Sequence, residues 1–216
     1  MSEEWDTVTA AVAEHADELK GMTSHGDIYR WAKAHDLTSR TLFPKFKAQL
    51  RRRLGIDYEQ LRDAATTQRA EQLADAAADA PQIVLWAAGD DDYERFAVCD
   101  VEGEALWYST FHADDRLYRG GDPTSASTSA AEKAVYLAGQ ARREAGLDTV
   151  RLRLRVCDAR VDAAVMTSAG VAAGVLVSVE VVEEDNPASE WCRAPGFKNW
   201  RESRLAALIG DTEVPR

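Results

Sequence analysis

Residues 129–156 read SAAEKAVYLAGQARREAGLDTVRLRLRV, which joins a helical pattern to a strand pattern. The first part carries small and apolar residues at helical spacing, and Gly146 follows it, as glycine commonly follows a helix. We expect residues 127–129 to cap the start of this helix. Residues 150–156 then alternate apolar and basic side chains, which predicts a strand with one buried face.

Strand patterns lie on both sides of this pair. Residues 83–89 form the short apolar run IVLWAAG, and residues 95–111 read as two strands around a turn. A small-residue helix near residues 160–169, a strand at residues 174–182 and a polar tail of helical character complete the chain. The order βββαβαβα predicts a mixed sheet with flanking helices.

The first eighty residues have a different character. Apolar residues recur there at helical spacing, with little β-branched alternation, and we expect three or four short helices. An alanine-rich acidic stretch ending at Pro81 is the best candidate for a linker. The sequence therefore predicts two domains, a small all-helical domain at residues 1–80 and an α/β domain at residues 81–216.

Composition excludes several classes of protein. The 216 residues are 45% hydrophobic and 29% charged, which is typical of globular chains and excludes a wholly disordered or collagen-like one. No apolar run is long enough for a membrane span, and the start of the chain lacks an apolar signal segment. The three cysteines have no metal-ligand spacing, which favours reduced thiols. We expect a cytoplasmic protein without a membrane partner.

The net charge of −11 hides one basic segment. Residues 39–53 read SRTLFPKFKAQLRRR and contain no acid. With the helix before it, this segment loosely resembles a helix-turn-helix, whose second helix contacts a groove or phosphates. The alternative is a solvated helix face packed through its leucine and phenylalanine residues. The candidate nucleic-acid-binding residues are Arg40, Lys45, Lys47, Arg51, Arg52 and Arg53.

Three motifs in the second half resemble one known family. The helix at residues 129–140 is similar to the pattern N-x-A-E-Y-x-A-L-x-x-G-L, with Glu132 at the glutamate. Asp158, in RVCDARVDAAV, matches the aspartate of V-x-G-D-S-x-x-V at a strand end, and Glu190 takes the aspartate position of E-E-N-x-x-A-D-x-L. On these motifs, residues 82–208 resemble the ribonuclease H family, in particular its type 1 branch.

The resemblance implies a ribonuclease H-like mixed sheet and metal-dependent cleavage of the RNA strand of an RNA–DNA hybrid. Two Mg²⁺ or Mn²⁺ ions clamp the attacking and leaving oxygens in such chemistry, and converging carboxylates hold them. Glu132, Asp158 and Glu190 are then the implied catalytic residues and metal ligands. The helical domain would hold the hybrid or duplex.

The match breaks at the first strand. The family reads Y-T-D-G there, whereas this chain has Trp86-Ala87-Ala88-Gly89, and alanine cannot ligate a metal. Asp90 faces the same side of a regular strand as Ala88 but lies ~6–7 Å further along, so only a bulge would recruit it. Three explanations remain open: natural loss of catalysis, a rearranged site that uses Asp90 or its neighbours, or an engineered replacement at Ala88.

Other interpretations stand beside the nuclease hypothesis. Glu132 is alternatively a plain surface residue, and Asp158 is alternatively the residue that caps the start of the following helix. The alternative function is a non-catalytic nucleic-acid-binding or regulatory protein on a ribonuclease H-like fold. A third is a protein–protein module, for which the acidic total charge suffices.

Overall fold

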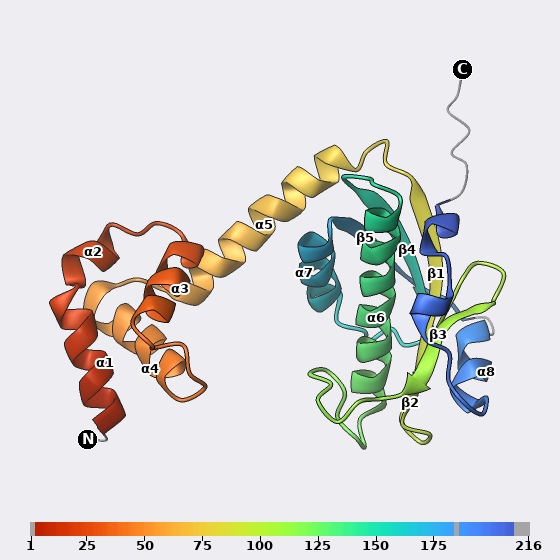
Figure 1. Ribbon diagram of the computed structural model, residues 1–216, viewed down its shortest axis with the longest axis horizontal. Coiled ribbons are helices and arrows are strands. Elements are labelled where there is room, and N and C mark those ends of the chain that lie inside the picture. Colours follow the sequence, from red (N-terminus) through yellow and green to blue (C-terminus); the bar gives the residue numbers. More distant parts are fainter. Residues whose placement is uncertain (1–2, 184–185, 210–216) are drawn as a thin grey trace. The chain divides into compact units, whose positions relative to one another are not determined.

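The computed structural model describes residues 3–183 and 186–209, and the chain forms two compact units that divide between residues 69 and 70 (Figure 1). The division falls within helix α5, Tyr58–Ala76, rather than at the predicted boundary after residue 80. The start of α5 belongs to the core of the first unit, because Tyr58 is buried there and Leu61 packs against it.

The regular secondary structure of the first unit is all helical within its described residues. Its elements are α1 (Glu3–Glu14), α2 (Ala16–Lys20), α3 (His25–Ala34), α4 (Leu42–Gln49), a π-helical turn (Leu50–Leu54) and the beginning of α5. Gly55 ends the π-helical turn with a left-handed φ of 72°, a conformation that glycine adopts without strain. Val8, Val12, Ile28, Phe46 and Leu50 are fully buried in one apolar core.

The second unit contains a five-stranded mixed sheet, which confirms the predicted mixed α/β class with flanking helices. The strand order is β3-β2-β1-β4-β5; β1 pairs antiparallel with β2 and parallel with β4, and β5 is parallel to β4. The elements are β1 (Gln82–Asp90), β2 (Arg95–Cys99), β3 (Ala105–Thr110), α6 (Pro123–Glu144), β4 (Val150–Val156), α7 (Ala163–Ala173), β5 (Val175–Val181), α8 (Pro187–Arg193) and two 3-10 turns (Trp200–Glu202 and Leu205–Leu208).

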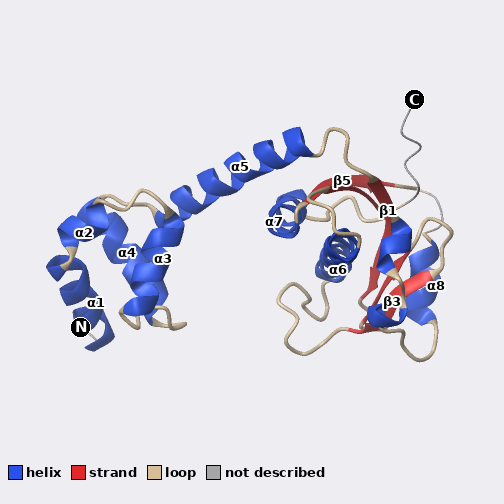
Figure 2. Ribbon diagram, turned by 45° about the horizontal axis from the view of Figure 1, so that its top comes forward, coloured by secondary structure: helices blue, strands red, loops and turns tan. Residues whose placement is uncertain are grey.

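Helices cover the two faces of the sheet unequally. Helices α6 and α7 lie on one face, and α8 lies on the other beside β3 (Figure 2). The alternation of β4 buries Leu152 and Leu154 in the core under α6, so the arginines between them face away from it. Helix α8 packs a smaller cluster, including Ala188 and Cys192, against β1, β2 and β3.

Helix α6 begins earlier than the sequence pattern predicts. Asp122 is its cap, and its carboxylate accepts hydrogen bonds from the backbone N–H groups of Thr124 and Ser125, with Pro123 in the first turn. Aspartate followed by proline is a standard helix start, whereas residues 127–129 lie inside the helix. The helix is therefore longer at its start than expected, and residues 123–128 belong to it.

None of the described helices is both long enough and apolar enough to cross a membrane.

Candidate functional site

A polar pocket of about 340 Å³ opens where the carboxyl ends of β1 and β4 meet the first turns of α6 and α8. Open α/β sheets commonly bind ligands beyond the carboxyl ends of their strands. The lining residues are Ala87, Ala88, Gly89, Ser127, Val156, Cys157, Asp158, Arg160, Asn186 and Ser189. Of the four expected catalytic residues, Asp158 is the one in this pocket.

Asp158 follows β4 and is held from several directions. The side chain of Arg160 donates from Nε to Oδ1 at 3.0 Å and from Nη2 to Oδ2 at 3.2 Å, and the backbone N–H of Arg160 donates to Oδ1 at 2.9 Å. Burial acts to raise the pKa of Asp158, but these bonds and one from the Thr124 hydroxyl lower it below the usual value. Asp158 is thus an ionised group whose charge is already matched by an arginine.

Gly89 sets the distance between β1 and α6. A Cβ at this position would lie 2.2 Å from the backbone oxygen of Ala126, so only glycine permits this approach of strand and helix. The close approach places Ser127, the next residue of α6, in the pocket. A serine therefore occupies the place on the helix where the family resemblance led us to expect Glu132.

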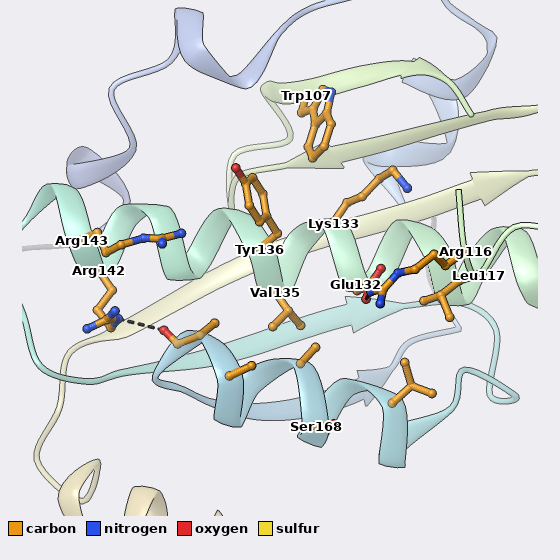
Figure 3. Close-up of a pocket in the computed structure, with 14 residues that line it drawn as sticks. Trp107, Arg116, Leu117, Glu132, Lys133, Val135, Tyr136, Arg142, Arg143 and Ser168 are labelled. Carbon is orange, nitrogen blue, oxygen red and sulfur yellow. Dashed lines mark hydrogen bonds and ion pairs between the residues drawn. The ribbon is translucent and has the colours of Figure 1, made fainter. Parts of the chain in front are cut away.

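Glu132 lies elsewhere on α6. It is five residues beyond Ser127, which rotates it by about 140° and carries it ~7.5 Å along the helix axis. Its Oε1 accepts a hydrogen bond from Nη2 of Arg116 at 3.1 Å, and it lines a separate hollow between α6 and α7 (Figure 3). The helix phase thus separates Glu132 from Asp158.

That second hollow has a volume of about 850 Å³ and is mainly apolar. Val135 and Tyr136 of α6 lie in it, together with small residues of α7 and Trp107 of β3 (Figure 3). Arg142 lies at one end, where its Nε donates to the carbonyl of Ala173 at 2.9 Å. Glu132, the one carboxylate in the lining of this hollow, is paired with Arg116, so the hollow offers no evident catalytic group.

The last motif serves the fold rather than a metal. Asn186 is 5% exposed; it caps α8 through the N–H of Ala188, and its Nδ2 donates to the carbonyl of Ala87 at 2.9 Å. Glu190 is exposed and does not line the pocket, whereas Ser189 does. Asn186, which matches the asparagine of the family motif E-E-N-x-x-A-D-x-L, thus joins α8 to β1.

Asp90 also lies outside the pocket. Its Oδ1 accepts a hydrogen bond from the backbone N–H of Tyr93 at 3.2 Å, and its Oδ2 lies 3.8 Å from Nε of Arg193. Asp90 pairs with Arg95 in the regular ladder between β1 and β2, so no bulge turns it toward Asp158. Its neighbour Asp91 accepts hydrogen bonds from the Tyr118 hydroxyl and the Gly121 N–H. These bonds fix the loop that precedes α6.

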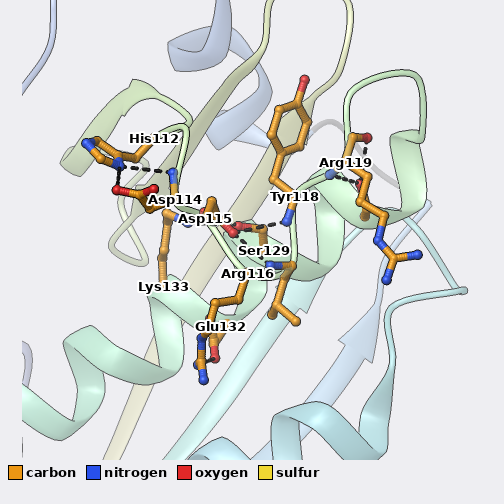
Figure 4. Close-up of polar contacts among 11 residues, drawn as sticks. His112, Asp114, Asp115, Arg116, Tyr118, Arg119, Ser129, Glu132 and Lys133 are labelled. Carbon is orange, nitrogen blue, oxygen red and sulfur yellow. Dashed lines mark hydrogen bonds and ion pairs between the residues drawn. The ribbon is translucent and has the colours of Figure 1, made fainter. Parts of the chain in front are cut away.

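The loop before α6 is fixed by a buried ion pair. Asp115 accepts from Nζ of Lys133 at 2.5 Å, from the Ser129 hydroxyl at 2.8 Å and from the backbone N–H of Tyr118 at 3.0 Å (Figure 4). Burial acts to raise the pKa of Asp115, but these bonds outweigh it and lower the pKa to about 2. The polar residues of α6 that face this loop are thus structural.

The donor set does not fit the two-metal site that the family resemblance implies. Two hard cations need several converging oxygen ligands, most of them charged. Within residues 3–183 and 186–209, no group of three or more His, Cys, Asp or Glu side chains is placed to hold a metal ion. Asp158 is the single carboxylate in the pocket lining, and Arg160 supplies its counter-charge.

The basic residues of the first unit fall into two groups. Lys45 and Lys47 of α4 are half-buried and paired with Glu4 and Glu59, so they hold the helices together. Arg53 donates to the side chain of Gln49 at 3.1 Å.

Exposed positive charge gathers on the π-helical turn. Arg51, Arg52 and Arg53 are all exposed, and Arg51 lies 3.5 Å from Asp57. Arg40 and Arg52 form no ion pair or side-chain hydrogen bond within the part of the chain that the structure describes. The sequence predicted six equivalent cations, whereas the structure leaves four of them at the surface.

Comparison with known proteins gives no match, whether to a family model, to a curated protein or to a solved structure.

Proposed function

We propose that this chain is a non-catalytic nucleic-acid-binding protein whose second unit has a ribonuclease H-like fold. Support for the fold comes from the order of elements and from the mixed sheet, with Asp158 at the end of β4 as the motif requires. The observation that carries the loss of catalysis is the polar pocket, where Ala88, Ser127 and Ser189 stand at positions that carboxylates would need to occupy.

The nucleic-acid part of the proposal rests on four exposed arginines of the segment at residues 39–53, namely Arg40, Arg51, Arg52 and Arg53. Arginine binds phosphate through two parallel hydrogen bonds, and such contacts fix a protein on a duplex without reading its sequence. The charge also contrasts with the acidic balance of the chain as a whole, whose net charge is −11. We therefore expect binding to the phosphate backbone of a hybrid or duplex.

The test measures binding of the full chain to a fluorescent RNA–DNA hybrid between 50 and 200 mM salt. Four phosphate contacts predict a slope of log affinity against log salt of about −3 to −4. The variant Arg51→Ser/Arg52→Ser/Arg53→Ser should make this slope shallower by about 3. The matched control Arg30→Ser/Arg62→Ser/Arg69→Ser removes the same charge from other exposed positions of the unit. If both variants weaken binding equally, the proposed surface is wrong.

Cleavage is measured on the same hybrid with Mg²⁺ and separately with Mn²⁺. We expect the hybrid to stay intact, because the pocket has one carboxylate and that carboxylate is matched by Arg160. Metal-dependent cleavage that Asp158→Asn abolishes would contradict the non-catalytic assignment and support a ribonuclease H-type nuclease instead.

A further inference from the structure

A row of three arginines lies on β4, on the face of the sheet opposite to α6 and outside the lining of the polar pocket. Arg151, Arg153 and Arg155 alternate along β4 with leucines that are buried under α6. Helix α8 shares this side of the sheet but packs against β1, β2 and β3. The helices that pack against β4 and β5 in the described chain are α6 and α7, on the opposite face (Figure 2).

Each guanidinium in this row is held in place by a contact at its inner nitrogen. Nε of Arg151 donates to the carbonyl of Ala80 at 2.9 Å, and Nε of Arg155 donates to Glu180 at 3.1 Å. Arg155 also lies 4.9 Å from the centre of the Trp86 ring. The terminal nitrogens of Arg151 and Arg155 have no hydrogen-bond partner within the described residues. Fixed side chains with unused donors lose little conformational entropy when a ligand binds.

The charge on this face is positive. Arg153 forms a two-pronged pair with Glu180, with Nε at 2.6 Å and Nη2 at 2.7 Å from its carboxylate oxygens. Glu180 therefore forms ion pairs with both Arg153 and Arg155. It is the one acidic residue among the β4 and β5 residues of this face. Three arginines against one glutamate leave two positive charges in a single line.

The spacing of the row suits a repeating anion. Alternate residues of a parallel strand lie ~6.6 Å apart, which is similar to the separation of consecutive phosphates in an extended nucleic-acid strand. Half-buried apolar side chains lie beside the arginines, with Val84 next to Arg153 on β1 and Leu176 next to Arg151 on β5. Such neighbours offer contact to sugars and bases between the charged groups.

From this arrangement we infer that the face formed by Arg151, Arg153 and Arg155 binds the phosphate backbone of single-stranded nucleic acid along β4. One straight row of cations matches one backbone, whereas a duplex presents two. The choice of nucleic acid over an acidic peptide rests on the proposed function, because carboxylates of an extended peptide repeat at a similar distance.

The experiment measures binding of the full chain to a fluorescent dT20 oligonucleotide. The variant Arg151→Gln/Arg153→Gln/Arg155→Gln should bind at least about tenfold more weakly, with a salt slope shallower by about 2, because each phosphate contact to a single strand contributes about 0.7. The matched control Arg143→Gln/Arg201→Gln/Arg204→Gln changes three exposed arginines elsewhere in the second unit and should leave binding nearly unchanged. Equal loss in both variants would overturn the inference.

A second variant guards against loss of folding as the cause. Glu180→Gln removes the competing carboxylate and should tighten dT20 binding about fivefold, an effect that misfolding cannot produce. Unchanged or weaker binding by Glu180→Gln would contradict the inference. Competition by poly-glutamate as effective as that of unlabelled dT20, at equal concentration of charge, would show that the ligand class is wrong.

The proposed surface of the first unit and the arginine row on β4 can be tested independently, because each is expected to bind a different nucleic acid. The arginine variant of β4 should keep its affinity for the RNA–DNA hybrid, and the variant of Arg51, Arg52 and Arg53 should keep its affinity for dT20. If the first-unit variant leaves hybrid binding unchanged, the proposed function fails at that surface, while loss of dT20 binding by the β4 variant still supports the inference.

Discussion

The guanidinium of Arg160 lies against both carboxylate oxygens of Asp158, with Nε 3.0 Å from Oδ1 and Nη2 3.2 Å from Oδ2. The residue that sequence motifs identify as a metal ligand is therefore half of an ion pair within its own loop. A side chain 15% exposed and bonded in this way is already stabilised as a carboxylate without a cation.

Removal of that arginine should be visible in the titration of Asp158. In Arg160→Ala the pKa of Asp158 should rise, because burial opposes the charged form and the two side-chain hydrogen bonds and the positive charge of Arg160 are lost, while the backbone bond stays. Carboxyl ¹³C NMR titration measures this directly. Arg119→Ala, which removes another exposed arginine that lies near the start of α6, should leave the Asp158 titration as it was. An unshifted pKa of Asp158 in Arg160→Ala would show that the guanidinium of Arg160 does not control the titration of this carboxyl group.

An aspartate at position 88, where the family resemblance implies one, should not produce cleavage activity. Ala88→Asp adds a second carboxylate to the pocket, but Glu132 stays with Arg116 on another side of α6. We expect no cleavage of a labelled RNA–DNA hybrid with Mg²⁺ or Mn²⁺. The informative contrary result is cleavage by Ala88→Asp that disappears when Asp158→Asn is added, since this would identify the chain as a disarmed nuclease.

Asp115 should contribute to stability in a pH-dependent way. Its pKa is about 2, below the usual 3.8, so its contribution is present above about pH 4 and is lost as the pH falls toward 2. The difference corresponds to about 2 kcal/mol. Asp115→Asn should therefore lower the free energy of unfolding in urea by about that amount at pH 7, and by much less near pH 2.

The neighbouring residue provides the control for this measurement. The side chain of Asp114 is 92% exposed, whereas that of Asp115 is 8% exposed. Asp114→Asn should change stability little at either pH. A loss in Asp115→Asn that is the same at both pH values would mean that its charge is not the cause.

Gly89 should tolerate no side chain. In Gly89→Ala the new Cβ would meet the backbone of Ala126, which cannot rotate away as a side chain would. We expect a loss of at least about 2 kcal/mol in urea unfolding, or failure to fold. Gly120→Ala is the matched control, because its nearest neighbour, the Tyr118 hydroxyl, lies 3.8 Å from the added atom. Equal stability of the two variants would disprove the close packing.

Much of the fold could be predicted from local patterns. The strand at residues 150–156 was predicted with the bounds that the structure has, because arginine and leucine alternate there without interruption. The hairpin of β2 and β3 was also predicted, because a glycine, Gly103, interrupts the strand pattern there. In the structure Gly103 lies in the turn with a φ of 87°. These features depend on near neighbours in sequence, which a pattern can reveal.

The site was harder to predict because it depends on the phase of one helix against one strand. A start at residues 127–129 leaves the orientation of Glu132 undetermined, whereas the true cap at Asp122 and the contact of Gly89 with Ala126 turn Ser127 to the pocket. The Asp122-Pro123 pair was the available signal for this start. The pairing of Lys45 with Glu4 spans 41 residues, so no local pattern indicates that this lysine is occupied.

The two edges of the sheet differ in a way that bears on self-assembly. Lys198 pairs with Tyr108 through two backbone hydrogen bonds of 3.2 and 3.0 Å, which covers the outer edge of β3 at its middle, while β5 pairs with β4 alone among the described strands. A sheet open at both edges can add copies without end and grow into a fibre. With β3 covered at Tyr108, the sheet favours edge-to-edge association of two copies through β5, and such a pair leaves no further β5 edge exposed.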